Sequence, residues 1–342
     1  MADDFEELCS RLREGSEKAA LLTASQKNNA LTKVIDSLQK NKDAILEANA
    51  SDVEAARSRG MSEALLERLA LDQKKFQAMT DGIKVIVSQA DPIGEETSGW
   101  KVPNGMQIRQ VRVPLGVVAI IYESRPNVTV DAFALAYKSG NSILLRGSSS
   151  ALKSNTAIVK AIKEGLEAAG QDGVSDALFL CQPKQDHSDV EQILCARGKI
   201  DVVLPRGGAK LIQSVVENAK IPVIETGSGV CHLFVEKTAD LAMAAKIAAN
   251  AKMQRPGACN AIETVLVQRD VAKDFLPLMA KEFAEKVQVR ADKESFAILS
   301  GLYKNLKEAR EEDFGYEFLD FTLAVKVVSS TEEAIQFINS HN

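Results

Sequence analysis

The pattern of apolar positions divides the chain into a helical segment and a later segment of alternating strands and helices. Over residues 4–90 the apolar positions recur at helical spacing, as at Leu31, Val34 and Leu38. Residues of the capping type, such as Asp72, open new helical segments. The pattern therefore predicts a helical N-terminal layer.

A segment near residues 99–113 has the pattern of a β-hairpin. Asn104-Gly105 is a strong signal for a tight turn, and Met106 and Ile108 alternate with polar residues. The alternation resumes at Val111 after a slip of one residue. An exposed hairpin has an unpaired edge that usually finds a partner chain. We therefore expect a homo-oligomer that uses this hairpin.

From Val117 the chain alternates between strand and helix. Residues 117–122 are a continuous apolar run of the kind buried on both faces of a parallel sheet, and residues 128–139 are typical of a helix that Gly140 ends. The pattern repeats as strand and helix pairs at 142–146 with 152–166, 177–181 with 189–196, and 201–204 with 209–219. This order predicts a doubly wound α/β sheet.

Composition narrows the classes of function. The chain has 342 residues, of which 45% are hydrophobic and 26% are charged, as expected for a soluble protein with a large core. A net charge of −5 provides no broad basic surface, so we expect no nucleic-acid partner. The acidic start is unlike a secretory signal, and no apolar run is long enough to span a membrane. We expect a cytoplasmic protein without a membrane partner.

The cysteines and histidines do not have the spacing of a disulfide framework or a zinc site. The five cysteines have no paired CxxC spacing, and the chain has three histidines. This pattern predicts reduced thiols and no metal site. The cysteines are Cys9, Cys181, Cys195, Cys231 and Cys259.

Cys259 is the strongest candidate for chemistry. It lies in residues 254–260, with the sequence QRPGACN, where small residues and a turn-forming proline present one thiol at the mouth of a loop. Only a thiolate attacks carbonyl carbon well, and Arg255 provides a permanent positive charge nearby. The alternative is a small buried hydrophobe, which is a common role for free cysteine.

Two turns are candidates for binding phosphate. Ligands of doubly wound sheets bind where strands end and helices begin, because free backbone N–H groups favour anions there. The first turn, after the predicted strand at 142–146, contains Arg146, Gly147 and Ser148. The second, after the predicted strand at 201–204, contains Arg206, Gly207 and Gly208. In the alternative, glycine and serine only make the turns. Neither turn matches GxGxxG or GxxxxGK[ST], so a conventional Rossmann fingerprint and a P-loop are not supported.

Several sequence blocks occur in an order that chance seldom produces. They are YESRPNVT at 122–129, KSGNS at 138–142, LLRG at 144–147, LPRGG at 204–208, IPVIETG at 221–227 with Cys231-His232, and QRP at 254–256 with Cys259-Asn260 and Glu263-Thr264. In these blocks the chain resembles the gamma-glutamyl phosphate reductases, or glutamate-5-semialdehyde dehydrogenases, of the aldehyde dehydrogenase superfamily. The resemblance covers essentially the whole chain. It implies an aldehyde dehydrogenase-like α/β fold with a doubly wound parallel-sheet cofactor domain and a smaller α/β catalytic domain.

The resemblance also implies a reaction and an organisation. The reaction is reduction of L-glutamyl 5-phosphate by NADPH to glutamate 5-semialdehyde and phosphate, the second step of proline biosynthesis, through a thioester on Cys259. Residues 1–253 would hold the helical layer and the NADP-binding domain, and residues 254–342 the catalytic domain. Glutamate 5-kinase, which makes the labile acyl phosphate, is an expected partner.

The family pattern implies roles for individual residues near the reacting carbonyl. Asn127 matches the asparagine of the oxyanion hole, where its side-chain N–H would act with the backbone N–H of Cys259. Arg255 would bind the substrate phosphate or lower the pKa of Cys259. We also expect Ser124 and Arg125 to contact the substrate.

Further residues are implied to bind the cofactor. Arg146 takes the position of a lysine near the adenosine ribose, where a guanidinium would suit the 2′-phosphate of NADP. Glu225, which in hydrolytic relatives activates water, would contact cofactor or substrate, or be structural. Glu317 takes the position of the glutamate that binds the nicotinamide ribose. His232, beside Cys231, is expected to pack rather than react.

The resemblance predicts that the chain stops short of its relatives. Family members run about 70 to 80 residues beyond Asn342. We therefore expect a catalytic domain without its terminal strands, with low hydrogen-exchange protection beyond Ile262 and an uncovered hairpin. Two alternatives remain: an inactive remnant that binds cofactor, and a reductase of the same superfamily that acts on another acyl substrate.

Overall fold

A computed structural model describes residues 2–171, 173–225 and 229–341. The chain divides into two compact units, Met1–Thr226 and Gly227–Asn342. The sequence placed a domain boundary after residue 253 instead. The structural division comes earlier because β7 (Cys231–Val235) pairs with β8 (Ile262–Gln268) in the second unit's sheet, and because α10 (Leu241–Met253) packs against α11 (Arg269–Phe283).

The helices predicted for the N-terminal segment are confirmed. They are α1 (Ala2–Ala20), α2 (Ala24–Lys40), α3 (Lys42–Ser58), α4 (Glu63–Leu69) and α5 (Gln73–Ser88). Thr23 and Gln26 form a capping box that starts α2, and the Asp72 side chain accepts a hydrogen bond from the backbone N–H of Lys75 at the start of α5. These caps satisfy N–H groups that the first turn of a helix leaves without partners.

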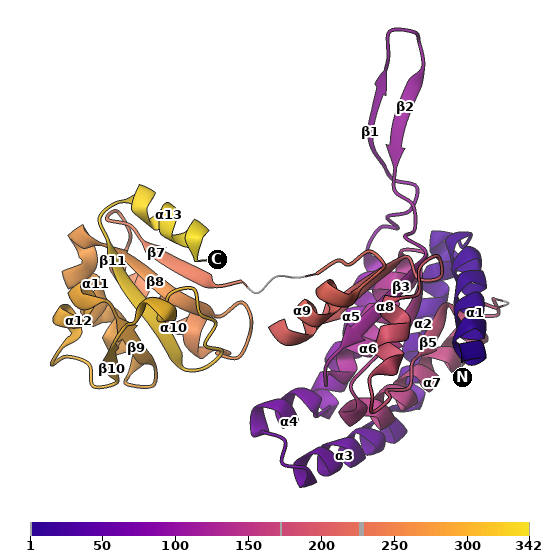
Figure 1. The fold of residues 1–342 in the computed structure, drawn as a ribbon, viewed down its shortest axis with the longest axis horizontal. Helices are drawn as coiled ribbons and strands as arrows, with labels where there is room; N and C mark the ends of the chain where they lie inside the picture. The colour runs from indigo at the N-terminus through magenta and orange to yellow at the C-terminus, as the bar shows by residue number, and fades with distance from the viewer. Residues whose placement is uncertain (1, 172, 226–228, 342) are drawn as a thin grey trace. The chain divides into compact units, whose positions relative to one another are not determined.

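The predicted hairpin is also present. Strands β1 (Glu96–Lys101) and β2 (Gln107–Val111) form an antiparallel two-stranded sheet, which Figure 1 shows as an extended arm. Gly105 has a φ of 90°, a left-handed conformation that glycine adopts readily. The irregularity in register lies between Glu96 and Ser98 on β1. Trp100 and Met106 are exposed, so the hairpin carries apolar side chains that its own pairing does not cover.

The first unit contains a parallel four-stranded sheet in the order β5-β4-β3-β6. Its elements are β3 (Val117–Tyr122), α6 (Pro126–Lys138), β4 (Ser142–Arg146), η1 (Ser149–Ala151), α7 (Leu152–Ala168), η2 (Val174–Ala177), β5 (Leu178–Leu180), α8 (Ser188–Leu194), β6 (Val202–Arg206) and α9 (Ala209–Asn218). The doubly wound sheet predicted from the sequence is therefore confirmed.

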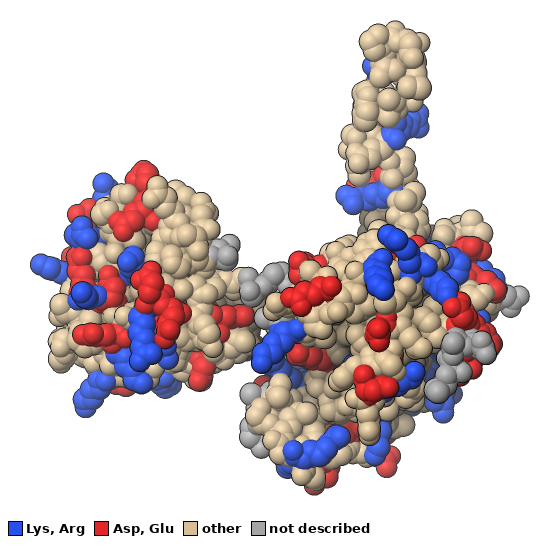
Figure 2. Space-filling view, viewed as in Figure 1, with Lys and Arg blue, Asp and Glu red and all other residues tan. Residues whose placement is uncertain are grey.

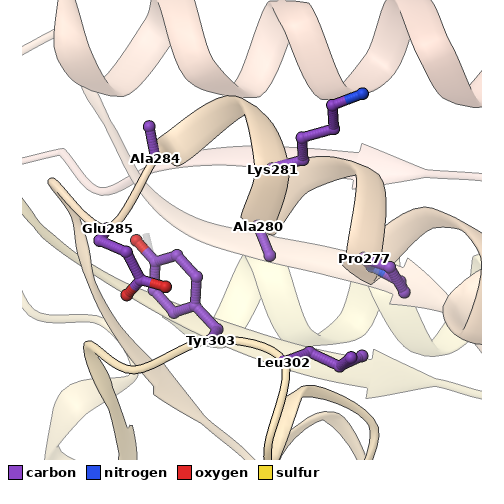
Figure 3. A pocket seen from close by; sticks show the side chains of 7 residues that line it. All are labelled: Pro277, Ala280, Lys281, Ala284, Glu285, Leu302 and Tyr303. Atoms are coloured by element: carbon purple, nitrogen blue, oxygen red, sulfur yellow. The ribbon is translucent and has the colours of Figure 1, made fainter.

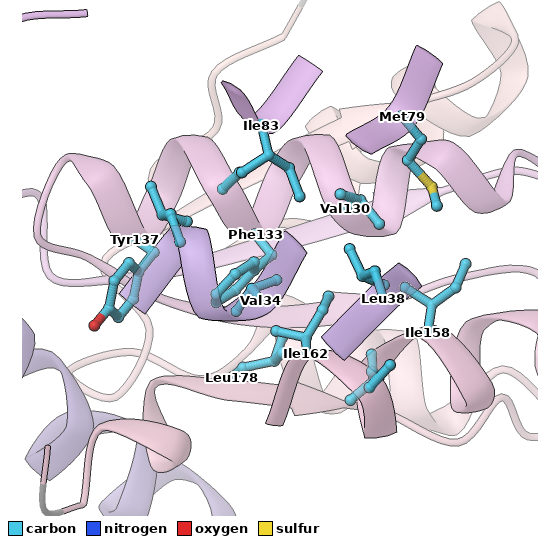
Figure 4. Close-up of a cluster of buried hydrophobic side chains, with 14 of the residues drawn as sticks. Val34, Leu38, Met79, Ile83, Val130, Phe133, Tyr137, Ile158, Ile162 and Leu178 are labelled. Atoms are coloured by element: carbon cyan, nitrogen blue, oxygen red, sulfur yellow. The ribbon is translucent and has the colours of Figure 1, made fainter. Parts of the chain in front are cut away.

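The two faces of this sheet bury alternate residues. Ile143 and Leu145 of β4 belong to a core with α2, α5, α6 and α7, whereas Leu144 belongs to a second core with α1 and α8. This alternation follows from the two-residue period of a strand. Figure 4 shows the first core, in which Phe133 and Ile162 lie between the helices. Helices thus cover both faces, which explains why the strands read as continuous apolar runs.

The sheet reverses its winding between β3 and β6. The chain runs from β3 outward through β4 to β5, and then returns past β3 to β6 on its other side. Tyr122 and Arg206, the last residues of these two strands, are paired in the register. Two turns therefore meet at one carboxyl edge, at the kind of switch point where doubly wound sheets bind ligands.

The second unit has a parallel five-stranded sheet in the order β10-β9-β11-β8-β7. Its further elements are β9 (Gln288–Ala291), α12 (Lys293–Leu299), β10 (Leu306–Glu308), η3 (Glu311–Asp313), β11 (Thr322–Val328) and α13 (Thr331–Ser340). Helices α10, α11 and α12 share one core with the sheet, and Phe337 of α13 packs in a smaller one. All residues of β8 are buried. This unit therefore has a core of its own.

The surface mixes both signs of charge. Figure 2 shows acidic and basic side chains interspersed on the face drawn, and the outer end of the hairpin is mostly uncharged there. Among the described residues, no helix combines the length and the apolar character needed to cross a bilayer.

Candidate functional site

The predicted site residues fall on both units. The first unit holds Ser124, Arg125, Asn127, Arg146, Gly147, Ser148, Arg206, Gly207, Gly208 and Glu225, and the second holds Arg255, Cys259 and Glu317.

Cys259 lies on a double turn between α10 and β8. The N–H of Ala258 donates to the carbonyl of Arg255 at 3.0 Å, with Pro256 at the turn position that proline favours. The N–H of Ala261 donates to the carbonyl of Ala258 at 3.0 Å, so Cys259 follows the first turn directly and is the second residue of the next one. Cys259 is exposed. The alternative of a buried structural thiol is therefore wrong.

A second thiol lies beside this turn. Cys231, at the start of β7, has its Sγ 3.6 Å from the backbone carbonyl oxygen of Cys259. Burial raises the pKa of Cys231, and the nearby Cys259, Glu263 and Glu317 raise it further. The thiol of Cys231 therefore stays protonated more readily than that of a free cysteine. Glu317 therefore lies near enough to Cys231 to act on its pKa.

A buried ion pair brackets the Cys259 turn. The Nζ of Lys252, in the last turn of α10, lies 2.6 Å from Oε2 of Glu263, near the start of β8. Burial raises the pKa of Glu263 and lowers that of Lys252, and in each case the partner opposes the shift. The second carboxylate oxygen of Glu263 accepts the backbone N–H of Leu319 at 3.1 Å.

In the first unit, the turns after β3 and β6 meet at the switch point of the sheet. The N–H of Glu123 donates to the carbonyl of Arg206 at 3.2 Å, and the Glu123 carboxylate accepts the N–H of Gly208 at 3.0 Å. A Cβ at Gly207 would lie 2.7 Å from the Glu123 carboxyl carbon, so a side chain there would displace this carboxylate. The start of α9 is therefore a cradle that already holds an anionic group.

The turn after β4 joins this edge through serine hydroxyls. The Oγ of Ser150 lies 2.7 Å from that of Ser124 and 2.8 Å from that of Ser148. A Cβ at Gly147 would come within 2.3 Å of the Asn155 amide, so close packing alone requires glycine there. Ser124 and Ser148 are thus brought together, while Gly147 has a structural role.

Arg146 is buried and paired. Its Nε donates to Oδ2 of Asp189, at the start of α8, at 2.7 Å, and an Nη atom lies 3.5 Å from Nδ1 of His187. Burial raises the pKa of Asp189, but hydrogen bonds from Arg146 and from the backbone N–H of Lys184 lower it. Together these lowering contributions outweigh burial, so the net shift of the pKa is downward. The guanidinium charge is therefore already balanced within the protein.

Asn127 lies in the first turn of α6. Its amide Nδ2 donates to Oδ2 of Asp131, one turn later, at 3.1 Å. Burial raises the pKa of Asp131, and this hydrogen bond opposes the rise. The contact uses one of the two N–H donors of the amide. Arg125, the residue before the helix, lines a pocket of about 210 Å³ with Leu65, Arg68, Glu123 and Ser124.

Two other predicted positions differ in their packing. Glu225 is exposed and follows the short bridge between Val203 and Val223 at the edge of the first sheet. His232 packs edge-on against Phe337, with 6.0 Å between ring centroids, and burial lowers its pKa. His232 is thus a packing residue in this structure.

A separate pocket of about 280 Å³ opens at the end of α11 (Figure 3). Pro277, Ala280, Lys281, Ala284, Glu285, Leu302 and Tyr303 line it, and none of them is a predicted site residue. The hydroxyl of Tyr303 donates to the carbonyl of Val287 at 2.7 Å, and the carboxylate of Glu285 accepts the N–H of Lys304. The polar groups of Tyr303 and Glu285 are therefore used in internal hydrogen bonds.

The sequence did not identify the charged partners in these turns. Glu123, Asp189 and Lys252 were not predicted as site residues, because each acts through a contact with another segment of the chain, 85, 43 and 11 positions away, respectively. Glu263 belongs to the quoted Glu263-Thr264 block, which was the one available signal for it.

Comparison with known proteins assigns the family. The aldehyde dehydrogenase family model matches residues 1–299. Gamma-glutamyl phosphate reductase of Heliobacterium modesticaldum is 46% identical over 333 residues, which cover 97% of this chain and 78% of that protein. Gamma-glutamyl phosphate reductase of Clostridium acetobutylicum is 48% identical over 325 residues, covering 94% of this chain and 76% of that protein.

Solved structures agree with this assignment. The crystal structure of gamma-glutamyl phosphate reductase from Thermotoga maritima matches with a TM-score of 0.91 at 42% identity, covering 98% of this chain and 80% of that one. A propionaldehyde dehydrogenase from Clostridium phytofermentans has a TM-score of 0.65 at 14% identity, covering 96% and 78%, and shares the fold alone. The predicted aldehyde dehydrogenase-like fold is confirmed. The chain therefore belongs to the gamma-glutamyl phosphate reductases of the aldehyde dehydrogenase family, and it is an oxidoreductase.

Proposed function

We propose that this chain reduces L-glutamyl 5-phosphate to glutamate 5-semialdehyde and phosphate, with NADPH as the reductant, in proline biosynthesis. The observation that carries the proposal is the exposed thiol of Cys259 on its double turn, in a chain 46% identical to a gamma-glutamyl phosphate reductase. An exposed thiol on a turn is accessible to an acyl substrate, as a nucleophile must be.

The residues of the first unit fit a nicotinamide dinucleotide. The cradle formed by Gly207 and Gly208 lies at the switch point of the sheet, where the N-terminus of α9 favours anions, and it accommodates the Glu123 carboxylate as a stand-in for a phosphate oxygen. When bound, the reduced nicotinamide supplies a hydride. Arg146 would share its guanidinium between Asp189 and a 2′-phosphate. Arg146→Ala should therefore weaken NADPH binding more than NADH binding.

The protein's own groups carry the acyl transfer. Cys259 attacks the acyl carbon, phosphate leaves, and a thioester forms on Sγ. Asn127 is the proposed donor to the oxyanion, and one such donor is typically worth about 3 kcal/mol. Arg255 is the proposed ligand of the departing phosphate. Ser124 and Arg125 would contact the substrate, and Glu225 and Glu317 the cofactor. Reduction of the thioester to a hemithioacetal then releases the aldehyde and regenerates the thiol.

Further proposals concern the setting of the reaction. The exposed apolar residues of the β1–β2 hairpin support a homo-oligomer. Because an acyl phosphate is labile, we also propose that a glutamate 5-kinase supplies the substrate nearby, in the cytoplasm.

The reverse reaction tests the proposal. Purified protein is given glutamate 5-semialdehyde, phosphate and NADP, and the formation of NADPH is followed by absorbance. We expect NADPH formation that depends on phosphate. Parallel assays replace phosphate with coenzyme A and the semialdehyde with propionaldehyde. Turnover in those assays alone would instead favour another acyl substrate, and cofactor binding without any turnover would indicate an inactive protein.

A further inference from the structure

The loop that carries Cys259 is closed at its base by one buried ion pair. Lys252 precedes the loop, Glu263 follows it, and their charged atoms are 2.6 Å apart. The exposed fractions of the two side chains are 0% and 1%, so neither charge is solvated by water. The path of residues 254–261 between these two anchors is therefore tied to the position of a single carboxylate.

The same carboxylate also holds a second segment. Oε1 of Glu263 accepts the N–H of Leu319 at 3.1 Å, while Oε2 binds Lys252 at 2.6 Å. Leu319 has a φ of 52°, a left-handed conformation that is uncommon for a residue with a side chain. Such a conformation persists only where surrounding contacts over-determine it. Glu263 therefore joins the Cys259 loop to the segment that carries Glu317.

Stability alone does not account for a pair of this kind. Removing two charges from water costs free energy, and well-packed apolar residues of similar volume often serve as well or better. The pair instead provides directed contacts, since each oxygen of Glu263 has a fixed partner. Apolar side chains would fill the same space without holding the N–H of Leu319.

We propose that Lys252 and Glu263 are positioning residues, which hold the Cys259 loop and the Glu317 segment in the arrangement that the reaction requires. The inference rests on the proposed function for the roles of Cys259 and Glu317. It goes beyond that function because neither Lys252 nor Glu263 is assigned a contact with substrate or cofactor. Their effect reaches the reaction through the two segments that they join.

Two double variants separate positioning from stability. Lys252→Met/Glu263→Gln removes both charges but keeps an oxygen that can accept the N–H of Leu319. Lys252→Met/Glu263→Leu removes both charges and that acceptor. We expect both to keep a melting temperature near that of the wild type. We expect kcat to fall at least about ten-fold in the Leu variant, with a raised KM for NADP, and less in the Gln variant.

A second readout does not depend on turnover. The rate at which iodoacetamide alkylates Cys259 in the unliganded protein reports the position of the loop, and we expect it to change at least about three-fold in the Leu variant. The control is Arg269→Gln/Glu294→Gln, which removes an exposed ion pair of the same unit. We expect no change in either readout for the control.

A folded Leu variant with kcat and alkylation rate both within about two-fold of the wild type would overturn the proposal. If the Leu variant does not fold, Glu263→Asp keeps the charge and shortens the side chain by one methylene. We expect the same changes in kcat and in the alkylation rate for Glu263→Asp as for the Leu variant. Values of both within about two-fold of the wild type would again overturn the proposal. If the wild type has no phosphate-dependent activity, the proposed function fails, and the alkylation rate still decides whether the pair positions the loop.

Discussion

At the scale of single residues, the cysteines of this chain differ in reactivity because their surroundings differ. Burial raises the pKa of Cys9 and of Cys181 to about 11, so both are almost entirely protonated at neutral pH. Cys259 and Cys195 are both exposed. Exposure therefore selects two candidate thiols, and only Cys259 lies on the double turn that follows α10.

Alkylation tests this distinction. If Cys259 is the nucleophile, we expect iodoacetamide at neutral pH to label it first and Cys195 more slowly. Cys9 and Cys181 should react last, because burial keeps these two thiols protonated and the thiolate is the reacting form. Peptide mass spectrometry over time measures the order. Cys195→Ser is the matched control and should leave both labelling of Cys259 and turnover unchanged. Faster labelling at Cys195 than at Cys259 would contradict the assignment of the nucleophile.

Glu123 provides a second prediction at this scale. Its carboxylate accepts the N–H of Gly208 in the proposed phosphate cradle, so it competes with a cofactor phosphate for that donor. Glu123→Gln should tighten NADP binding roughly three- to five-fold, which corresponds to the ~1 kcal/mol or less of an exposed charge contact. Fluorescence titration measures the affinity. Glu217→Gln, at the other end of α9, is the control, and unchanged or weaker binding in Glu123→Gln would refute the competition.

The sequence provided candidate residues for the site but not the contacts that these residues make. A proline and small residues around Cys259 indicated a thiol on a loop, but a buried cysteine remained an alternative until the structure showed that Cys259 is exposed. The burial of Arg146 was not predictable, because its partner Asp189 lies 43 positions away and belongs to another strand and helix pair. Charge pairing across such separations depends on the sheet order, which local patterns do not specify.

At the scale of elements, the Arg146–Asp189 pair ties the end of β4 to the start of α8. Arg146→Met would leave Asp189 as a buried charge without this partner, so we expect the free energy of unfolding at pH 7 to fall by about 3 kcal/mol. Urea titration measures it. Arg146→Met/Asp189→Leu, which removes both charges, should recover most of the loss. A single variant as stable as the wild type would show that the pair is not buried in solution.

The pair also predicts a dependence on pH. The pKa of Asp189 is lowered in the folded protein, so its contribution to stability is complete above the unfolded value of about 3.9 and is lost as pH falls through the folded value. The stability difference between the wild type and Asp189→Asn should therefore be constant near neutrality and shrink below about pH 4. If the stability difference between the wild type and Asp189→Asn grew toward low pH, the pKa of Asp189 would not be lowered in the folded protein.

The hairpin is the element whose role extends beyond the single chain. Val111 and Trp100 are exposed on strands that pair with one another in a two-stranded sheet. Trp100→Lys/Val111→Lys should reduce self-association, because charge on an edge strand opposes pairing with another chain. Analytical ultracentrifugation measures the mass of the particle. An unchanged melting temperature is the control that the variant is folded. Unchanged self-association would show that the hairpin does not form the interface.

Local patterns predicted individual elements well and the division of the chain less well. The run at 117–122 and the turn at Asn104-Gly105 are signals that a few adjacent residues carry. The assignment of β7 to the second sheet depends instead on its pairing with β8, some thirty residues later. An apolar strand of that kind fits either sheet from its sequence alone.

At the scale of the whole molecule, each unit has a core of its own, and stability should follow these cores. We expect slow hydrogen exchange in β3 and β4 of the first unit and in β8 and β11 of the second, because these are inner strands with buried side chains. The hairpin should exchange fast. This revises the expectation of low protection beyond Ile262, since β8 begins there and is buried throughout. Uniformly fast exchange after Ile262 would favour the original expectation.

The central claim is that Cys259 carries an acyl group between phosphate and hydride transfer. A rapid-mixing experiment with glutamate 5-semialdehyde and NADP, without phosphate, tests it most directly, because oxidation of the aldehyde then stops at the thioester. For the wild type we predict a burst of NADPH stoichiometric with enzyme, followed by steady turnover once phosphate is added. For Cys259→Ala we predict neither the burst nor turnover, although its affinity for NADP should be unchanged. A burst of the same size from Cys259→Ala, or no burst from folded wild-type protein that binds NADP, would contradict the account.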